Sequence, residues 1–330
     1  MALRIALIGA GGIGTQWANG LKKSDHVKLV VIIDTDLSKA EALAQETNAK
    51  AAADWKEVKD DFDAAVVAVP HKWLAPTTKE LLENGKHVLC EKPAGITAAE
   101  VEENIRIAKE KNLVYMTGFN HRYHPAYLEA KKRFDAGQIG ELMFIRARYG
   151  FGGRPGYEKE WRFKKEIGGG GELIDQGMHM IDMVRWFMGE VKDVKGFAEN
   201  MFWGGEVEDN GFALLRTADR KVASIHVSWT NWGWVHSFEI YGKKGYLLID
   251  GLDTRYRGPE RLTIGQADPQ GGKFPTEEVI PYESEQKEDS LQREADDFAR
   301  AIQGETVQIP RGEDSVAALT VVEQIYQKHD

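Results

Sequence analysis

The chain has 330 residues, of which 42% are hydrophobic and 29% charged, and a formal net charge of −9 at pH 7. A chain of this length usually forms more than one hydrophobic core, so two domains are expected in a globular protein of ordinary composition. The negative charge argues against a general affinity for nucleic acids or anionic membranes, and no apolar run reaches the length of a membrane-spanning helix.

Cysteine usage bears on the compartment. The single cysteine, Cys90, excludes an internal disulfide framework and fits a cytoplasmic location, where thiols stay reduced. It lies in an apolar stretch, so we expect a buried and inert thiol.

A glycine-rich turn follows the first apolar run of the chain, residues 3–8. The run is typical of a buried strand, and the glycines behind it have the spacing Gly-x-Gly-x-x-Gly at the start of a helix. In this arrangement backbone N–H groups at a helix N-terminus can approach a pyrophosphate closely. The cofactor-binding residues predicted here are Gly9, Gly11, Gly12, Ile13 and Gly14.

A second apolar run, residues 27–33, ends on Asp34 and Thr35. An acidic residue about 20 positions after the glycines is the expected partner of the adenosine ribose hydroxyls. A 2′-phosphate beside this carboxylate would be repelled, on the order of a few kcal/mol at an effective dielectric constant near 20. No Lys or Arg follows immediately to offset this repulsion, so the sequence favours NAD over NADP.

Short apolar runs alternate with helical patterns as far as about residue 121, which is typical of parallel βαβ units. Capping boxes that begin at Ser38 and Thr97 predict two helix starts. The other predicted elements are helices over residues 14–24 and 70–84 and strands over residues 64–69, 85–90 and 113–117. We therefore expect an N-terminal doubly wound parallel sheet of the Rossmann type.

Ligands in such sheets bind at the carboxyl ends of the strands. Three segments of the chain lie at such ends. The cofactor-binding residues predicted there are Val69, Pro70, His71, Glu91, Lys92 and Asn120.

The pattern changes after residue 121, where strand-like segments predominate. A helix is predicted over residues 125–136, another over 171–188, and two amphipathic helices over 291–303 and 314–328. The predicted strands cover residues 142–149, 194–201, 211–216, 221–229, 237–241, 245–250 and 261–264. We expect residues 1–121 to form the Rossmann domain and residues 122–330 an α+β domain with a large, mainly antiparallel, open sheet. Helices would cover one face of that sheet, and a second subunit could cover the other.

Lys92 is the first candidate for chemistry. It lies at a strand end beside the expected nicotinamide position, in the sequence Glu91-Lys92-Pro93. A lysine there could bond a substrate hydroxyl and stabilise negative charge on its oxygen. The alternative is an ordinary surface lysine in a turn.

The second candidate is a run of four glycines, whose backbone can let a ligand approach closely, followed by Asp175 and His179. These two residues are four apart, so a continuous helix would place them on one face. An imidazole with a pKa near ~6.5 can accept a proton at pH 7. The alternative interpretation is that Asp175 and His179 are an ordinary pair on a helix surface. No metal site is expected, because no third and fourth ligand follows at a suitable spacing.

Together and in this order, these segments resemble the glucose–fructose oxidoreductase/inositol dehydrogenase/rhizopine-catabolism (Gfo/Idh/MocA) family over essentially the whole chain. The resemblance rests on the glycine turn, on residues 85–93, on Gly118-Phe119-Asn120-x-Arg122 and on residues 169–182. It implies that Lys92 bonds the reacting hydroxyl, that His179 is the general acid/base and that Asp175 orients substrate and histidine. It also implies a supporting role for Asp182 and a homodimer or homotetramer formed through the C-terminal sheet.

One departure from the family pattern occurs after Pro70. Relatives carry Asn at the next position and His three residues later, whereas this chain has His71 and Leu74 there. His71 is therefore predicted either to lie near the cofactor or to have a packing role.

The segment before the glycine run is predicted to form part of the substrate pocket. Basic side chains could hold a carboxylate or phosphate, and aromatic rings could stack on a sugar. The substrate-binding residues predicted from these features and from the family motifs are Lys92, His121, Arg122, Arg154, Tyr157, Trp161, Arg162, Asp175 and His179. For Trp229, Trp232 and Trp234 we favour sheet packing or a subunit interface over a second aromatic patch.

The expected function is hydride transfer between NAD and a secondary alcohol or ketone of a sugar, inositol, sugar acid or nucleotide sugar. Two alternatives remain open: an NAD-sensing regulator without turnover and a glycosidase that uses NAD transiently. Because a pure binder has no need of Lys92, Asp175 and His179 together, the sequence favours the oxidoreductase.

Overall fold

The computed structural model describes residues 2–253, 256, 258–268, 276–283 and 287–327. The chain divides into two compact units, Met1–Asn120 with Lys287–Ala317 and His121–Gln286 with Ala318–Asp330. Residues 287–317 were expected in the second domain, but they belong to the first unit. The reason is a helix near the end of the chain, α9 (Lys287–Ile302), which packs against α1 (Gly12–Lys23), with Lys23 Nζ 2.6 Å from Asp289 Oδ1.

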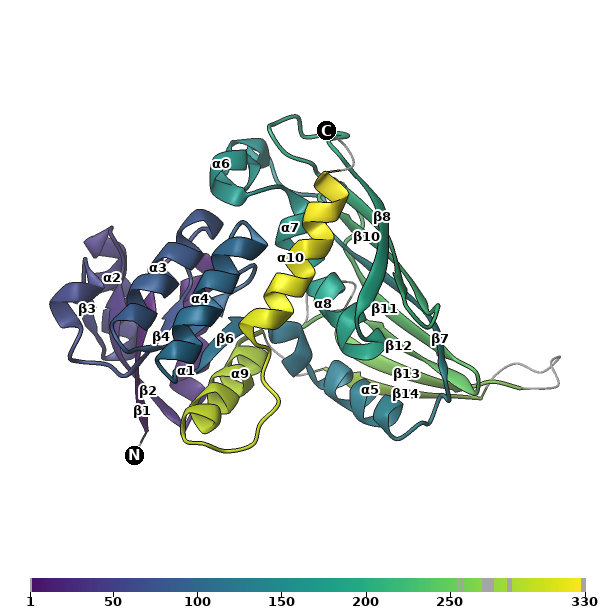
Figure 1. The fold of residues 1–330 in the computed structure, drawn as a ribbon, viewed down its shortest axis with the longest axis horizontal. Helices are drawn as coiled ribbons and strands as arrows, with labels where there is room; N and C mark the ends of the chain where they lie inside the picture. Colours follow the sequence, from purple (N-terminus) through teal and green to yellow (C-terminus); the bar gives the residue numbers. More distant parts are fainter. Residues whose placement is uncertain (1, 254–255, 257, 269–275, 284–286, 328–330) are drawn as a thin grey trace. The chain divides into compact units, whose positions relative to one another are not determined.

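The first unit is built on a parallel sheet with the strand order β3-β2-β1-β4-β5-β6 (Figure 1). Its strands are β1 (Leu3–Ile8), β2 (Val27–Ile33), β3 (Lys50–Ala52), β4 (Ala64–Val67), β5 (His87–Glu91) and β6 (Tyr115–Gly118). The order reverses between β1 and β4, which is the position where open α/β sheets form a ligand-binding crevice. The predicted doubly wound sheet is confirmed, and the short strand β3 was missed.

Helices connect these strands. They are α1, α2 (Leu37–Thr47), the 3-10 helix η1 (Trp55–Val58), α3 (His71–Glu83), α4 (Ala98–Glu110) and α9. The capping box at Thr97 is confirmed, because its hydroxyl accepts a bond from Glu100 N while Glu100 Oε2 accepts one from Ile96 N. The box at Ser38 is wrong: α2 already begins at Leu37, with Asp36 at its N-cap.

The second unit contains an eight-stranded sheet in the order β14-β13-β12-β11-β7-β10-β9-β8, in which only β7 and β10 pair in parallel among the described strands. Its strands are β7 (Leu142–Gly150), β8 (Val191–Glu199), β9 (Asn210–Thr217), β10 (Val222–Ser228), β11 (Val235–Gly242), β12 (Gly245–Asp250), β13 (Glu260–Gln266) and β14 (Thr276–Tyr282). The mainly antiparallel sheet is confirmed. β14 was missed because its sequence, Thr-Glu-Glu-Val-Ile-Pro-Tyr, is polar and contains a proline, as an edge strand allows.

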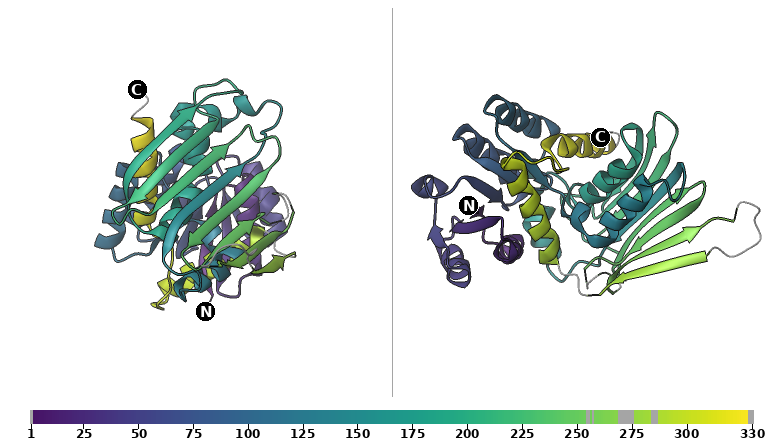
Figure 2. Two further views of the ribbon diagram at one scale, coloured as in Figure 1. Left: turned by 90° about the vertical axis from the view of Figure 1, so that its right-hand side faces the viewer. Right: turned by 90° about the horizontal axis from the view of Figure 1, so that it is seen from below.

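Helices pack on one face of this sheet, where α8 contacts β7 and β10 and α5 contacts β12 and β13 (Figure 2). The helices of the unit are η2 (Asn120–Tyr123), which begins at the unit boundary, α5 (Pro125–Asp135), η3 (Tyr157–Lys159), η4 (Trp161–Phe163), α6 (Lys165–Gly168), α7 (Glu172–Asp175) and α8 (Gly177–Met188). The last helix, α10 (Gly312–Tyr326), enters this unit at Ala318, and its predicted end at residue 328 lies outside the described residues. No helix of sufficient length and apolarity to cross a bilayer occurs in the described ranges.

The single helix predicted over residues 171–188 is wrong. Two helices, α7 and α8, meet at Gln176, and His179 N bonds to Gln176 O in place of the carbonyl four residues back. Asp175 therefore ends one helix and His179 lies in the first turn of the next.

Candidate functional site

The glycine turn between β1 and α1 combines two kinds of glycine. A Cβ on Gly9, whose φ is +106°, would lie 2.3 Å from Ala68 O, and a Cβ on Gly14 would lie 2.0 Å from Gly9 O. These two glycines are needed for packing. Gly11 and Gly12, by contrast, have open space where a Cβ would be, and no side chain caps α1. The helix N-terminus is therefore accessible to an anionic group, which fits the pyrophosphate of a dinucleotide.

Asp34 lies directly after β2 and is held against the glycine turn. Its Oδ2 accepts a bond of 2.8 Å from Ala10 N, and its Oδ1 accepts one of 2.9 Å from Asp36 N. The carboxylate is thereby fixed beside the turn, where it fits ribose hydroxyl groups. The neighbouring Thr35 is exposed.

The other predicted cofactor residues lie at the carboxyl ends of β4, β5 and β6, which are neighbouring parallel strands. The first turn of α3 includes His71, which is buried, as is Leu74 of the same helix. Two of the residues are engaged by partners that the sequence did not indicate: Trp17 Nε1 donates to Glu91 Oε1 over 2.7 Å, and Asn120 Nδ2 donates to Ser290 Oγ over 3.2 Å. Lys92, Val69 and Pro70 are partly exposed at the same edge of the sheet.

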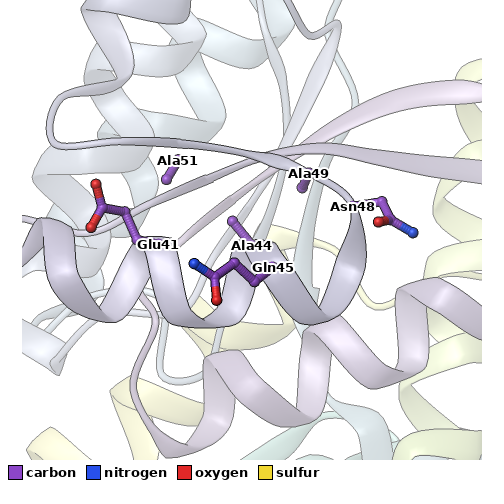
Figure 3. A pocket seen from close by; sticks show the side chains of 6 residues that line it. All are labelled: Glu41, Ala44, Gln45, Asn48, Ala49 and Ala51. Carbon is purple, nitrogen blue, oxygen red and sulfur yellow. The ribbon is translucent and has the colours of Figure 1, made fainter.

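An open depression beside α2 and β3 is separate from these residues (Figure 3). It is lined by Glu41, Ala44, Gln45, Asn48, Ala49 and Ala51. The lining has one carboxylate, two amides and small apolar groups, and none of the predicted site residues.

In the second unit, Asp175 is buried and bonded to Arg162. The guanidinium Nε donates to Asp175 Oδ2 over 3.0 Å, and the same guanidinium lies 4.5 Å from the ring centroid of Trp161. Burial by itself lowers the pKa of Arg162, but the negative charge of Asp175 and the hydrogen bond to it, with smaller contributions from Tyr157 and Glu160, outweigh this effect and raise the pKa above its ordinary value. Arg162 and Trp161 both stay partly exposed, so they can still contact a ligand.

His179 is buried on the first turn of α8, and its ring stacks face to face on His121. The ring centroids are 3.9 Å apart and the planes differ by 9°. His121 was predicted to bind an anionic group of the substrate, but the structure has one face of its ring occupied by His179. Both residues belong to the second unit, whereas Lys92 belongs to the first.

The glycine run before α7 is packed by residues that the sequence analysis did not identify. A Cβ on Gly171 would lie 1.8 Å from Glu208 O, and one on Gly170 would lie 2.2 Å from the Tyr326 hydroxyl. The buried Glu208 carboxylate accepts bonds from Gly171 N and Leu173 N, and Tyr326 donates to it over 2.6 Å. These two glycines were expected to let a ligand approach, but here they make room for Glu208 and Tyr326.

Three further residues that were predicted to bind substrate, Tyr157, Arg122 and Arg154, are engaged by other side chains of the protein. Tyr157 is buried in a hydrophobic cluster with Phe163, Val207 and Trp229, so its ring is not available for stacking on a sugar. Trp229 has the packing role that was favoured for it, whereas Trp232 and Trp234 are exposed. The remaining two predicted residues are paired with carboxylates: Arg122 with Asp182, in agreement with the supporting role of that aspartate, and Arg154 with Glu160.

Metal ligands are a separate question from these polar contacts. Among the residues that the structure describes, no group of three or more His, Cys, Asp or Glu side chains could hold a metal ion. Cys90 is buried, and burial raises the pKa of its thiol to about 12.

Comparison with known proteins identifies the class to which this fold and these residues belong. Residues 3–119 match an oxidoreductase family with an NAD-binding Rossmann fold, and residues 127–248 match the Gfo/Idh/MocA C-terminal domain. The chain belongs to the Gfo/Idh/MocA family of oxidoreductases and binds NAD through its N-terminal domain. The predicted family, enzyme class and cofactor are thereby confirmed.

Named relatives cover different shares of the chain. It is 32% identical to levoglucosan dehydrogenase of Pseudarthrobacter phenanthrenivorans over 226 residues, which is 60% of this chain and 58% of that protein. It is 25% identical to inositol 2-dehydrogenase of Rhizobium meliloti over 330 residues, 98% of this chain and 96% of that protein. The solved structure of a levoglucosan dehydrogenase in complex with NADH superposes with a TM-score of 0.90 at 25% identity, covering 99% of this chain and 98% of the other.

Proposed function

We propose that the protein is an NAD-dependent dehydrogenase or reductase that acts on a secondary alcohol or ketone of a sugar, inositol, sugar acid or nucleotide sugar. The observation that carries this proposal is the buried His179, held at the start of α8 in an NAD-binding oxidoreductase beside the Asp175–Arg162 pair. The named relatives act on levoglucosan and inositol, which supports a polyhydroxylated ring as substrate.

The proposed roles follow from the chemistry of each side chain. NAD, when bound, supplies the hydride acceptor. His179 takes the proton of the substrate hydroxyl, and Lys92 donates a hydrogen bond to the same oxygen and stabilises its developing charge. Asp175, fixed by Arg162, orients the substrate, and the partly exposed Trp161 and Arg162 contact its ring and polar groups.

Turnover of a substrate panel tests this proposal. Purified protein with NAD⁺ is mixed with free sugars, inositols, sugar acids and nucleotide sugars, and formation of NADH is followed by absorbance. We expect a signal with one class, and we expect Lys92→Met to lower kcat by orders of magnitude because the developing oxygen charge loses its partner. Lys109→Met is the matched control, since this lysine is 70% exposed and pairs with Glu313 on the surface of the same unit.

The outcomes separate the alternatives. Cleavage of a chromogenic glycoside without net NADH formation would replace the proposal with a glycosidase. Bound cofactor with no turnover of any compound would replace it with a sensor. Equal kcat in the Lys92→Met variant and the wild type would remove Lys92 from the mechanism.

We also propose that the protein is a homo-oligomer formed through the uncovered face of the second-unit sheet. Within the described residues, no helix covers this face (Figure 2), which carries exposed apolar side chains on neighbouring strands. They are Phe144, Phe197, Leu214 and Val222. Arg146 and Glu239 pair across β7 and β11 on the same face. The face therefore combines apolar and charged side chains, as subunit interfaces do that are exposed to water before assembly.

Light scattering coupled to size exclusion tests the oligomer. We expect the mass of two or four chains for the wild type and of one chain for a variant with Phe197→Arg and Leu214→Arg, because the added charges would be buried without partners. Leu37→Arg, at an exposed leucine of α2, is the control. A one-chain mass for the wild type would contradict the proposal.

A further inference from the structure

Lys92 lies in a turn whose backbone is strained. The turn directly follows β5 and is closed by a bond of 2.9 Å from Ala94 N to Glu91 O. Ala94 is buried and has a φ of +67°, in the left-handed region, where the Cβ of an alanine lies too close to the following carbonyl oxygen. A residue other than glycine keeps such a conformation only where the surrounding structure holds it. The groups that hold this turn therefore also fix the backbone of Lys92.

Two side chains from distant parts of the chain bond to the turn. Before Lys92, Trp17 Nε1 of α1 donates to Glu91 Oε1 over 2.7 Å. After Lys92, the Ser315 hydroxyl of α10 donates to Pro93 O. Trp17 and Ser315 are both fully buried, so water does not compete for either bond. The turn is thus anchored on both sides of Lys92, while Lys92 itself stays partly exposed.

Ser315 is in turn placed by the edge strand of the parallel sheet. Thr117 N of β6 donates to Pro310 O over 3.1 Å, two residues before α10 begins. A Cβ on Gly312, the first residue of α10, would lie 2.8 Å from a ring carbon of Tyr115, also of β6. The start of the helix is therefore bonded to and packed closely against this strand. All of these residues belong to the first unit.

We propose that Ser315 is a positioning residue for Lys92: its bond to Pro93 O holds the strained turn in the conformation that presents Lys92 at the end of β5. The proposal rests on the proposed function in so far as Lys92 bonds the reacting hydroxyl. A buried carbonyl oxygen without a donor is unfavourable, so this bond favours the one conformation of the turn in which Pro93 O meets Ser315. Without the bond the turn relaxes from the strained conformation, and the ammonium group of Lys92 loses its fixed position.

Local hydrogen exchange and lysine acylation test this proposal without a substrate. Ser315→Ala removes the donor and little volume. Mass spectrometry follows the exchange of the backbone amides of residues 91–95 and the acylation of the Lys92 amine by a trace of acetyl N-hydroxysuccinimide ester. We expect both to be several-fold faster than in the wild type. The amides of β1 and the amine of Lys50, whose side chain is 68% exposed in the same unit, should react at unchanged rates.

Thr117→Val is the matched control. Thr117 is also fully buried in the first unit, and its hydroxyl oxygen has no hydrogen-bond partner in the described part of the chain. The substitution therefore removes a buried hydroxyl at nearly constant volume and keeps the bond between Ser315 and Pro93. It should leave exchange at the turn and acylation of Lys92 unchanged.

Ala94→Gly provides a second variant that separates the strain from the bond. A glycine adopts a φ of +67° without a clash of Cβ, so the turn depends less on support from outside. Ser315→Ala should therefore accelerate the acylation of Lys92 less in the Ala94→Gly background than in the wild type. A double-mutant cycle measures this coupling.

Three results would overturn the proposal. One is wild-type exchange and acylation at the turn in Ser315→Ala. Another is an equal acceleration at β1 and at Lys50, which would show a general loss of stability. The third is an equal effect of Ser315→Ala in both backgrounds at position 94. Because these measurements use neither cofactor nor substrate, they are independent of whether the Lys92→Met assay supports the proposed function.

Turnover gives a further readout once that assay has identified a substrate. Ser315→Ala should then lower kcat and leave the KM for NAD⁺ nearly unchanged, because the glycine turn and Asp34 are intact. Wild-type kcat in this variant would show that the reaction does not need Ser315 to position Lys92.

Discussion

We expect the replacement of His179 by Asn to lower kcat by about 10²–10⁴-fold, the usual contribution of a positioned general acid/base. The amide of Asn is smaller than the imidazole and does not exchange a proton near neutral pH, so the substrate hydroxyl loses its proton acceptor. NADH affinity should change little, because the nucleotide turn belongs to Gly9, Gly11, Gly14 and Asp34 of the first unit. Absorbance assays with the substrate found in the panel, together with NADH fluorescence titration, measure the two effects separately.

His26→Asn is the control for this substitution, since His26 is an exposed histidine of the first unit and is not among the residues proposed for the site. It should retain wild-type kcat. Wild-type kcat in His179→Asn would show that another group moves the proton, and the proposed mechanism would then be wrong. Loss of NADH binding in the same variant would indicate a structural effect in place of a chemical one.

Much of the fold could be predicted because its determinants are local. The apolar runs before Gly9 and Asp34 are β1 and β2, and the spacing of the glycines selects the turn that connects β1 to α1. The capping box at Thr97 is also local, since the Thr97 hydroxyl accepts from Glu100 N and the Glu100 carboxylate accepts from Ile96 N within one turn. Features of this kind depend on a few consecutive residues, so the sequence displays them directly.

The features that were missed depend on contacts between residues far apart in the chain. α9 belongs to the first unit because it packs on α1, more than 250 residues earlier, and its amphipathic pattern does not say which surface it covers. In the sequence, Tyr157 is surrounded by polar residues, but in the structure it is buried against Trp229 and Phe163. An aromatic residue in a loop has the same appearance in sequence whether it contacts a ligand or a core.

The candidate site shows the same division. The sequence indicated Lys92, Asp175 and His179 through family motifs, but neither the stack of His121 on His179 nor the pairing of Arg162 with Asp175 follows from spacing. The glycine run was predicted to let a ligand approach the backbone closely. The groups that pack against Gly171 and Gly170 are instead Glu208 and Tyr326, which lie 37 and 156 residues further along the chain.

Glu208→Gln should destabilise the second unit by about 1–3 kcal/mol, because a buried N–H group would lose its acceptor. Glu208 accepts bonds from Gly171 N, Leu173 N and Tyr326, and an amide has one oxygen where the carboxylate has two. Its NH₂ group would face a donor in the buried site. The urea midpoint followed by tryptophan fluorescence, and hydrogen exchange of residues 168–180, should both report the loss.

Glu206→Gln is the matched control for the same loop. Glu206 also accepts a bond from a backbone N–H, that of Lys165, but it is exposed, so water can replace the lost acceptor. Its effect should stay within about 0.5 kcal/mol. Equal urea midpoints for the two variants would contradict the idea that the buried carboxylate holds the start of α7.

The pH dependence of stability gives this prediction a second readout. Burial raises the pKa of Glu208 above its ordinary value of 4.5, so the folded chain binds this proton more tightly than the unfolded chain. The contribution of Glu208 to stability is therefore fully present below the ordinary pKa and falls as pH rises through the raised pKa of the folded state. Glu208→Gln lacks this slope, so the difference in unfolding free energy between wild type and variant should narrow as pH rises across that window. A constant difference across the window would show that Glu208 does not titrate with folding, even if the variant is less stable.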